Sequence, residues 1–160
     1  MPNEINVNRG TAITWKVGGT ADMSMTSLAA AAGVQGSMHT LPDPGSRVWN
    51  WRVYTKFATA PVVGDMIYVY GKTSDGTHYD NDDGTTSGSV SAEDKLRNLT
   101  LMGVLIVDEA SSTPEFSTSG TVLIDAAQFA PVIWNATADA LSSTDADHGF
   151  ELTPVPDEIQ

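Results

Sequence analysis

The sequence predicts an all-β protein, an antiparallel β-sandwich of the jelly-roll type with about eight strands. Three observations support this prediction. Residues 48–57 alternate between large apolar and polar side chains, other short segments carry similar apolar patterns, and glycine, proline and aspartate recur between them. The 160 residues have the size of one domain that can bury a core. We expect a single domain over residues 1–160, with extended arms at about residues 1–8 and 154–160.

Residues 48–57 form the clearest predicted strand. One side of it would carry Trp49, Trp51, Val53, Thr55 and Phe57, and the other side Asn50, Arg52, Tyr54 and Lys56. Because successive side chains of a strand point to opposite faces, the pattern describes a sheet with one apolar and one solvated face. A row of exposed tryptophans that stack on sugars or bases is the functional alternative. Three large apolar groups on one face are more typical of a core, so we expect Trp49 and Trp51 to face inward.

The chain before this strand predicts two short strands and a loop. Residues 13–17 alternate between apolar and polar side chains and end at two glycines. Residues 23–28 alternate in the same way and are followed by a helical turn at residues 29–32, which Gly33 closes. A helix over residues 23–32 is the alternative for this segment. Residues 33–45, rich in glycine and proline, are expected to form an ordered loop.

The chain after the aromatic strand predicts the rest of the sandwich. Residues 66–70 follow a short turn and would pair with residues 48–57 as an antiparallel hairpin. Residues 71–91 are a polar insertion. Residues 99–107 are apolar on both sides of the strand, which indicates a strand in the centre of the sandwich or one pressed against a neighbouring subunit. Further strands are expected at residues 121–125, 131–135 and 148–153, and the prolines after them predict an edge or an arm.

Composition and charge limit the partners that the chain can bind. The formal net charge is −12, and the 8 lysines and arginines are scattered without a basic stripe. This pattern argues against direct binding to nucleic acid or to an anionic membrane. The absence of cysteine excludes disulfides and thiolate catalysis, and the apolar runs are too short to cross a bilayer. Since no leader segment opens the chain, we expect a soluble protein without an export signal.

The acidic loop at residues 75–83 is the strongest candidate for chemistry. Calcium needs several hard oxygen ligands from a flexible loop, and Asp80, Asp82 and Asp83 lie close enough in sequence to supply them. However, Gly84 stands where the loop of an EF-hand would place a third side-chain ligand, and no closing glutamate follows at the required spacing. The sequence therefore favours a solvated loop over a metal site.

No pattern predicts a catalytic, cofactor or metal site, and we expect a protein that is not an enzyme and needs no cofactor. The three histidines, His39, His78 and His148, lack metal-ligand spacing, and His148 is expected to be an ordinary residue at a strand edge. The acidic pairs at residues 93–94 and 108–109 flank strands, where adjacent side chains point apart. Two Asn-X-Thr sequences, at Asn98 and Asn135, are expected to be incidental.

Several segments, taken in order, resemble a recurring set of small structural proteins of tailed bacteriophages. None of them is a catalytic signature, and each is a packing or turn motif. The segments are MTSLA at 25–29 with AGVQG at 32–36, WRVYTKFA at 51–58 with AP at 60–61 and YVY at 68–70, LRNL at 96–99 with GVLIV at 103–107, and WNAT at 134–137 with ALS at 140–142 and LTPVPDE at 152–158.

The resemblance implies a head decoration or cement protein. Such a protein is a small β domain that sits on the capsid exterior of the virion, commonly as a homotrimer, and holds neighbouring major capsid proteins together. It assembles in the cytoplasm of the host cell and contacts neither nucleic acid nor membrane. Residues 3–7 and 154–160 are then expected to face the capsid or another subunit. Two alternatives stay open: a carbohydrate-binding β-sandwich that uses the tryptophans and calcium, and a tail or head-fibre component.

Overall fold

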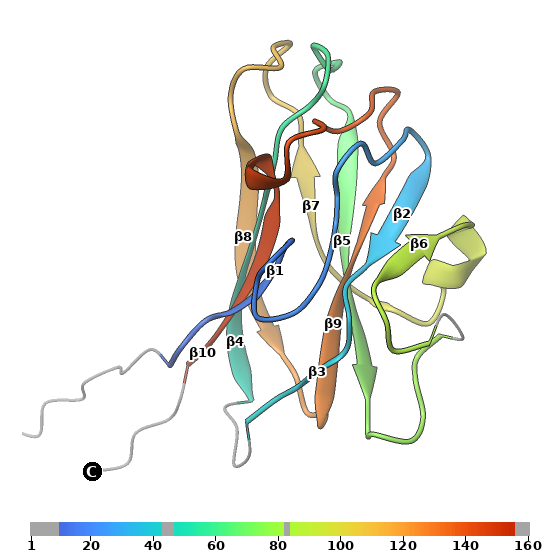
Figure 1. Cartoon of the computed structure of the whole chain (residues 1–160), viewed down its shortest axis with the longest axis vertical. Coiled ribbons are helices and arrows are strands. Elements are labelled where there is room, and N and C mark those ends of the chain that lie inside the picture. Colours follow the sequence, from blue (N-terminus) through green and yellow to red (C-terminus); the bar gives the residue numbers. More distant parts are fainter. Residues whose placement is uncertain (1–9, 43–46, 82–83, 156–160) are drawn as a thin grey trace, which may run out of the picture.

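A computed structural model describes residues 10–42, 47–81 and 84–155, which form two antiparallel sheets packed face to face (Figure 1). The first sheet contains, in spatial order, β1 (Ile13–Trp15), β10 (Gly149–Pro154), β4 (Val48–Thr55) and β8 (Phe116–Leu123). The second contains β6 (Gly88–Val90), β2 (Ala32–Gln35), β9 (Gln128–Asn135), β5 (Met66–Ser74) and β7 (Thr100–Ile106), with β3 (His39–Thr40) also paired to β9. Two short 3₁₀ helices complete the fold, η1 (Glu93–Leu96) and η2 (Asp145–Asp147).

The strand order confirms the predicted β-sandwich and its jelly-roll topology. When the short β3 and β6 are set aside, the first strand lies beside the last, as β1 lies beside β10, and β2 lies beside β9 in the other sheet. This nesting of outer around inner strands is the double Greek key of a jelly roll. The described residues form ten strands, because β3 and β6 add to the expected set.

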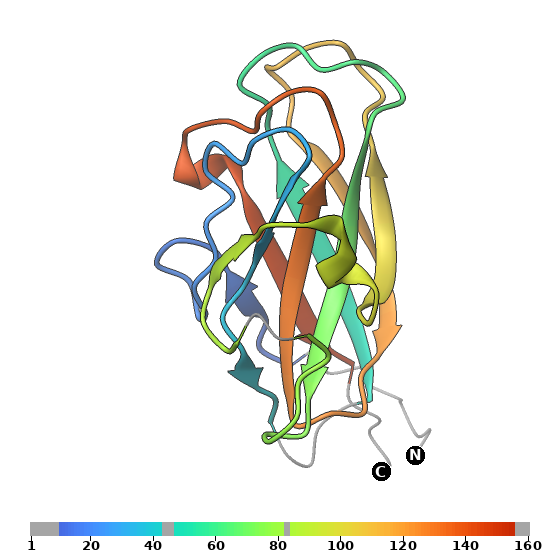
Figure 2. The same ribbon diagram turned by 90° about the vertical axis from the view of Figure 1, so that its right-hand side faces the viewer.

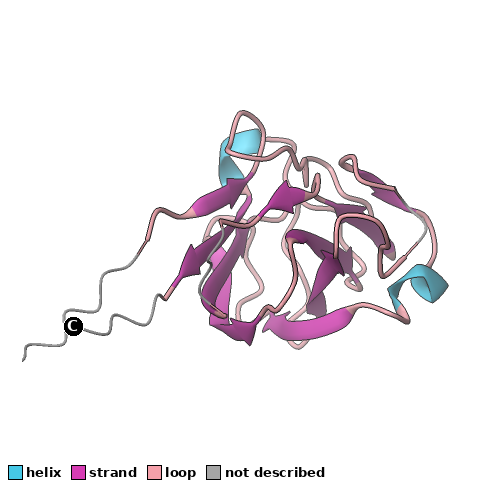
Figure 3. Cartoon of the chain, turned by 90° about the horizontal axis from the view of Figure 1, so that it is seen from below, coloured by secondary structure: helices cyan, strands magenta, loops and turns pink. Residues whose placement is uncertain are grey.

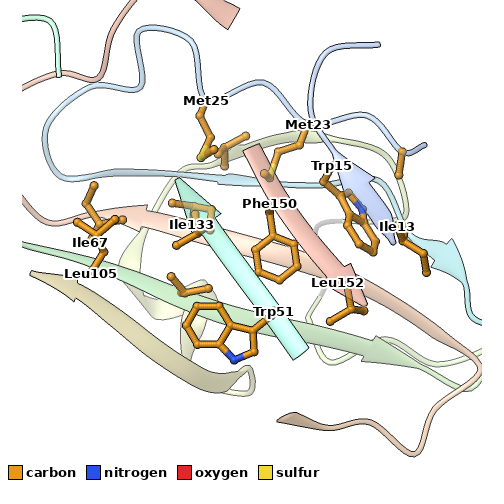
Figure 4. Packing of buried hydrophobic residues seen from close by; sticks show 14 of the residues in the cluster. Ile13, Trp15, Met23, Met25, Trp51, Ile67, Leu105, Ile133, Phe150 and Leu152 are labelled. Carbon is orange, nitrogen blue, oxygen red and sulfur yellow. The ribbon is translucent and has the colours of Figure 1, made fainter. Parts of the chain in front are cut away.

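The aromatic strand faces the core, as predicted. Trp49 and Trp51 are 0% and 3% exposed. The indole of Trp51 stacks on Phe150 of β10, with ring centroids 6.4 Å apart, and Phe150 meets Trp15 edge to face at 5.8 Å. Figure 4 shows these rings between the two sheets, with Ile133 of β9 beside them. Burying this much aromatic surface is the main stabilising contribution of β4.

The predicted hairpin between residues 48–57 and 66–70 is wrong. β4 pairs with β10 and β8, whereas β5 pairs with β7 and β9 in the other sheet. The connection at residues 56–65 crosses from one sheet to the other at the top of the sandwich in Figure 1. It is longer than the ~2–5 residues of a hairpin loop. Phe57 anchors it by packing edge to face on Phe116 at 5.4 Å.

The predictions for residues 23–32 are also wrong. Residues 22–31 are irregular, with neither the expected strand nor a helix. β2 begins at Ala32, the last residue of the expected helical turn, and continues into the expected loop. Met23 and Met25 are nevertheless buried in the core, so their alternation reflects packing without strand pairing. Positive φ angles at Ser27 and Ala31, 54° and 51°, are incompatible with a continuous helix.

The C-terminal strand lies inside its sheet and runs further than predicted. β10 is flanked by β1 and β4, Pro154 pairs with Trp49, and the N–H of Val155 donates to the carbonyl of Val48 at 2.9 Å. The pairing of β10 with β1 ends at Leu152, which lies opposite Ile13. No β1 carbonyl therefore lies opposite Pro154, and the proline, which has no N–H, is tolerated there. Residues 154 and 155 of the predicted C-terminal arm therefore belong to the sheet, and the predicted arm residues 1–8 and 156–160 lie outside the described residues.

Within residues 99–107, Thr100–Ile106 form β7 at the edge of the second sheet, so the prediction of a central strand is wrong. Leu105 and Val107 are buried against the core. Leu101 and Ile106 are 53% and 58% exposed, although they belong to the same apolar run. The protein chain therefore covers one of the two apolar faces of this strand and leaves much of the other uncovered.

Candidate protein-interaction surface

The acidic loop uses its first carboxylate to stabilise its own turn. Asp75 Oδ1 accepts hydrogen bonds from the backbone N–H groups of His78 and Thr77, both at 2.7 Å, and its Oδ2 lies 3.3 Å from His78 Nδ1. These hydrogen bonds lower the pKa of Asp75 to about 2, and the bond from the His78 N–H makes the largest contribution. His78 is exposed, as expected, and both residues serve the turn.

A second carboxylate of this loop is also engaged with the protein backbone. Asp80 Oδ2 accepts from the N–H and the hydroxyl of Thr73, at 2.6 and 2.8 Å, which ties the loop to β5. Among the described residues, no three His, Cys, Asp or Glu side chains come together in a way that would hold a metal ion. Asp82 and Asp83, the other candidate ligands, lie outside the described residues.

Lys72 is fully buried beneath this loop, a feature that the sequence analysis missed. Its Nζ donates to the carbonyl of Gly84 at 2.6 Å and to Gln35 Oε1 at 3.2 Å. Gln35 in turn donates through Nε2 to the carbonyl of Thr86 at 2.7 Å. The pair thus fastens residues 84–86 to β5 and β2. Buried lysines are rare unless their ammonium is bonded, so this cluster has a structural role.

His148 is buried, and the expectation of an ordinary edge residue is wrong. Its Nε2 donates to the carbonyl of Ser142 at 2.9 Å, and its Nδ1 therefore accepts from the hydroxyl of Thr55 at 2.7 Å. Burial lowers the pKa of His148. The neighbouring Asp147 accepts from the Ser142 hydroxyl at 2.7 Å and pairs with Lys56 at 3.2 Å. Both ring nitrogens of His148 are engaged in internal hydrogen bonds, so neither is left to bind a substrate.

Asn135 forms a second buried polar centre. Its Nδ2 donates to the carbonyls of Asp139, Ala29 and Leu28 at 2.9, 3.1 and 3.3 Å, and its Oδ1 accepts from the Thr137 hydroxyl at 2.7 Å. These bonds hold the irregular segment before β2 against the end of β9. The Asn-X-Thr sequence at Asn135 therefore serves packing, and the Asn135 amide is fully buried.

The tryptophans do not form a platform for sugars. Trp15, Trp49, Trp51 and Trp134 are 0%, 0%, 3% and 7% exposed. The outer face of the first sheet instead has a shallow polar hollow of about 370 Å³ between β4, β8 and β10. Its side chains include Asn50, Arg52, Ser119, Thr121, Glu151 and Thr153. The carbohydrate alternative thus loses the exposed aromatic rings that motivated it.

The second sheet leaves an apolar surface uncovered along its β7 edge. Figure 2 shows the segment that contains β6 and η1 crossing the front of this sheet, while the upper part of β5 and the neighbouring β7 stay open. The antiparallel register sets Met66 opposite Ile106, Tyr68 opposite Val104, and Tyr70 opposite Leu101. We call this region the apolar edge surface; its members are Val62, Val63, Met66, Tyr68, Tyr70, Leu101, Val104 and Ile106.

The turn before β5 belongs to this surface. The N–H of Gly64 donates to the carbonyl of Val107 at 2.8 Å, and the N–H of Val107 donates to the carbonyl of Asp65 at 2.9 Å. These bonds bring Val62 and Val63, 58% and 57% exposed, to the end of β7. The apolar edge surface therefore continues from the sheet onto the turn.

The apolar edge surface contains no ionised side chain. Its acidic neighbours include Asp65, whose Oδ2 is turned toward the N–H of Ala138 at 3.3 Å, and Glu93 and Asp94, which lie beside Tyr70. Tyr68 and Tyr70 are half-buried, with ring centroids 6.4 Å apart. Burial, with Tyr68 and the Glu93 carboxylate, raises the pKa of Tyr70, so its phenol stays neutral. This absence of charge contrasts with the net charge of −12 on the chain.

The described ends of the chain leave the sandwich together, away from the apolar turn. A Cβ on Gly10 would lie only 2.6 Å from Cγ of Pro154, so the backbone before β1 passes directly over the end of β10. Figure 3, seen from below, shows the described ends of the chain on the same side of the sandwich, where β1 begins and β10 ends. In Figure 1 they leave at the bottom, whereas the connection at residues 56–65 lies at the top.

Comparison of the sequence with protein-family models and with curated proteins finds no match. The helices within residues 10–42, 47–81 and 84–155 include none that is long and apolar enough to cross a membrane.

Proposed function

We propose that the protein is a decoration protein of a tailed-bacteriophage head, which binds the capsid exterior and stabilises contacts between major capsid proteins. The observation that carries this proposal is the common starting point of the two chain ends. Because Gly10 lies against Pro154, the segments before and after the jelly roll begin at one corner. Two arms that begin together are able to contact one capsid surface at once, and each strengthens the binding of the other.

The character of the described side chains supports a binding role. Asp75, Asp80 and His148, the groups with catalytic or metal-binding potential, are engaged in internal hydrogen bonds. The jelly roll supplies a rigid body, and four of the segments that resemble phage decoration proteins, at 32–36, 51–58, 68–70 and 103–107, lie mostly in its strands. The acidic chain is suited to the outside of a particle, away from the packaged nucleic acid.

The mechanism in this proposal is avidity. A homotrimer presents three copies of the same contacts, and the symmetry of the capsid multiplies them further. Each arm contact is then allowed to be weak, while the assembled shell is held firmly against internal pressure.

Capsid binding tests this function directly. Capsids made from the major capsid protein of the same genome, expanded by heat, are mixed with the full-length protein and imaged to measure occupancy. We expect saturable decoration of the exterior, and lower occupancy when residues 1–8 are removed. A full-length protein that leaves the capsids bare would refute the function.

Two deletion variants separate the roles of the arms. A variant without residues 156–160 is compared with the variant without residues 1–8. Both must retain the tryptophan fluorescence of the folded protein. Full occupancy with the N-terminal deletion would remove that arm from the mechanism. Full occupancy with both deletions in one chain would show that the common starting point of the arms plays no part in capsid binding.

A further inference from the structure

We propose that the apolar edge surface is the contact through which copies of this chain assemble with one another. This inference rests on the proposed function for the expected number of copies, three. Its location is argued from the fold alone. The occupant of the surface is a second copy of the same chain, packed against β7 and the turn that follows residue 61.

The first argument is that β7 is an unprotected sheet edge. An edge strand exposes unpaired N–H and C=O groups, and soluble proteins usually shield them with charged residues, proline or short strands. β7 spans Thr100–Ile106 with the sequence TLMGVLI, which includes none of these charges or prolines; its one irregularity is a register shift opposite Val69 and Tyr70. The other long edge strand, β8, also lacks charge and proline, but its exposed residues include Ser117, Ser119 and Thr121 beside Leu123. β7 differs in combining such an edge with an outer face that is apolar along its length, at Leu101, Val104 and Ile106.

The second argument is area. Five members of the surface, Val62, Val63, Met66, Leu101 and Ile106, are 39% to 58% exposed. Together they offer roughly 500 Å² of apolar area, near the upper end of what a monomer normally leaves open. A stable interface takes about 800 Å² from each partner. The half-buried tyrosines, Val104 and the free backbone edge of β7 supply the remainder.

The third argument is charge. Two chains that each carry −12 repel one another, so they approach most easily through a region without carboxylates. The members of the apolar edge surface carry no carboxylate, and Glu93 and Asp94 lie at its rim, beside Tyr70 and Arg97. A copy of the same chain supplies an equally uncharged surface, and three copies are able to bring the same small region together around a three-fold axis. Because a three-fold contact is heterologous, two different parts of the surface must meet in each contact, and β7 and the turn at residues 62–63 provide two such parts.

The position of the surface favours a second copy over the capsid as its occupant. Its turn lies at the end of the sandwich opposite to the chain ends at Gly10 and Val155, as Figure 1 shows. If the arms bind the capsid, the apolar turn projects away from it. Contacts between copies at that end would leave all arms free to point in one direction.

The test is the mass of the protein in solution, measured by light scattering. The chain has a mass of 16.9 kDa, and the wild type is expected at three times this value. Ile106→Lys places a charge at the centre of the surface and on the open edge, and is expected to reduce the mass to that of one chain. The matched control is Leu123→Lys, because Leu123 is 75% exposed on the other edge strand. Its mass is expected to equal that of the wild type.

A second substitution keeps the test decisive if the charge on β7 disturbs folding. Val63→Lys lies in the exposed turn outside the strand and is expected to dissociate the assembly in the same way. A wild type that is a monomer at tens of micromolar, or an assembly that survives both substitutions, would overturn the inference. A monomeric wild type that still decorates capsids would leave the proposed function standing. A protein that assembles in solution but does not bind capsids would refute the proposed function and leave the inference about self-association standing.

Discussion

Replacing Gly103 by alanine is expected to destabilise the protein through a clash with Trp51. A Cβ at residue 103 would lie 2.7 Å from Cη2 and 2.8 Å from Cζ2 of the indole, closer than carbon atoms approach without strain. Gly120, on the neighbouring edge strand β8, would bring its own Cβ to 3.0 Å from Cζ2 of the same ring. Glycines on two edge strands thus make room for one rigid side chain, and the methyl at residue 103 meets it at shorter range.

The magnitude follows from the size of the overlap. Overpacking a well-filled core usually costs about 1–3 kcal/mol, and removing a glycine from the unfolded chain returns about 0.4–1 kcal/mol. Gly103→Ala is therefore expected to lower the free energy of unfolding by about 1–2 kcal/mol. For a chain of this size that corresponds to a fall of about 3–8 °C in the unfolding temperature. Gly120→Ala, with its longer contacts, should cost less.

Urea unfolding followed by tryptophan fluorescence measures these values. A double-mutant cycle with Trp51→Phe then tests the cause, because the smaller ring removes the atoms that meet the new methyl group. Trp51→Phe destabilises the protein by itself, but Gly103→Ala should cost much less in that background than in the wild type. Equal costs in the two backgrounds would refute the explanation by steric overlap.

Three further predictions follow from the buried polar groups and the acidic loop. Because burial lowers the pKa of His148 below the 6.5 of an unfolded histidine, its contribution to stability is complete above that pH and is lost as the pH falls toward the folded pKa. Urea unfolding of wild type and His148→Gln at about pH 7.5 and pH 5 should show a steeper loss for the wild type. Asn135→Ala should lower the free energy of unfolding by at least about 2 kcal/mol, measured in the same way, because it leaves buried carbonyls without donors. Added calcium should not change the unfolding temperature, since Asp75 and Asp80 already accept backbone hydrogen bonds, and a saturable increase would contradict this.

The fold class was predictable because it depends on local periodicity, whereas strand pairing depends on distant segments. The alternation over residues 48–57 identified β4 and its buried face. Its neighbours in the sheet come from far along the chain, as Trp51 pairs with Leu152 on one side and with Gly120 on the other. The sequence-nearest partner, residues 66–70, lies in the opposite sheet. Nothing in a two-residue repeat distinguishes a turn within a sheet from a crossing between sheets.

The buried polar residues could not be predicted for a different reason. Lys72 stands at an outward position of β5, where a lysine is normally solvated. It is buried because residues 84–86 fold over that face and offer a carbonyl to its ammonium. His148 is buried because the loop at Ser142 returns and its carbonyl accepts a hydrogen bond from the His148 ring. In both cases the residue is covered by a loop, and loops have no periodic sequence pattern by which such a contact could be predicted.

Residues 99–107 have an apolar pattern that the fold of a single chain explains only in part. Their sequence is apolar on both sides, and such a pattern is typical of a strand covered on both faces. The core covers the inner side, through Leu105 and the close approach of Trp51 to Gly103. The outer side keeps Leu101 and Ile106 more than half exposed. A lysine at either position would protect the edge and favour solubility, so a covering partner gives the apolar outer side a physical reason that the isolated jelly roll lacks.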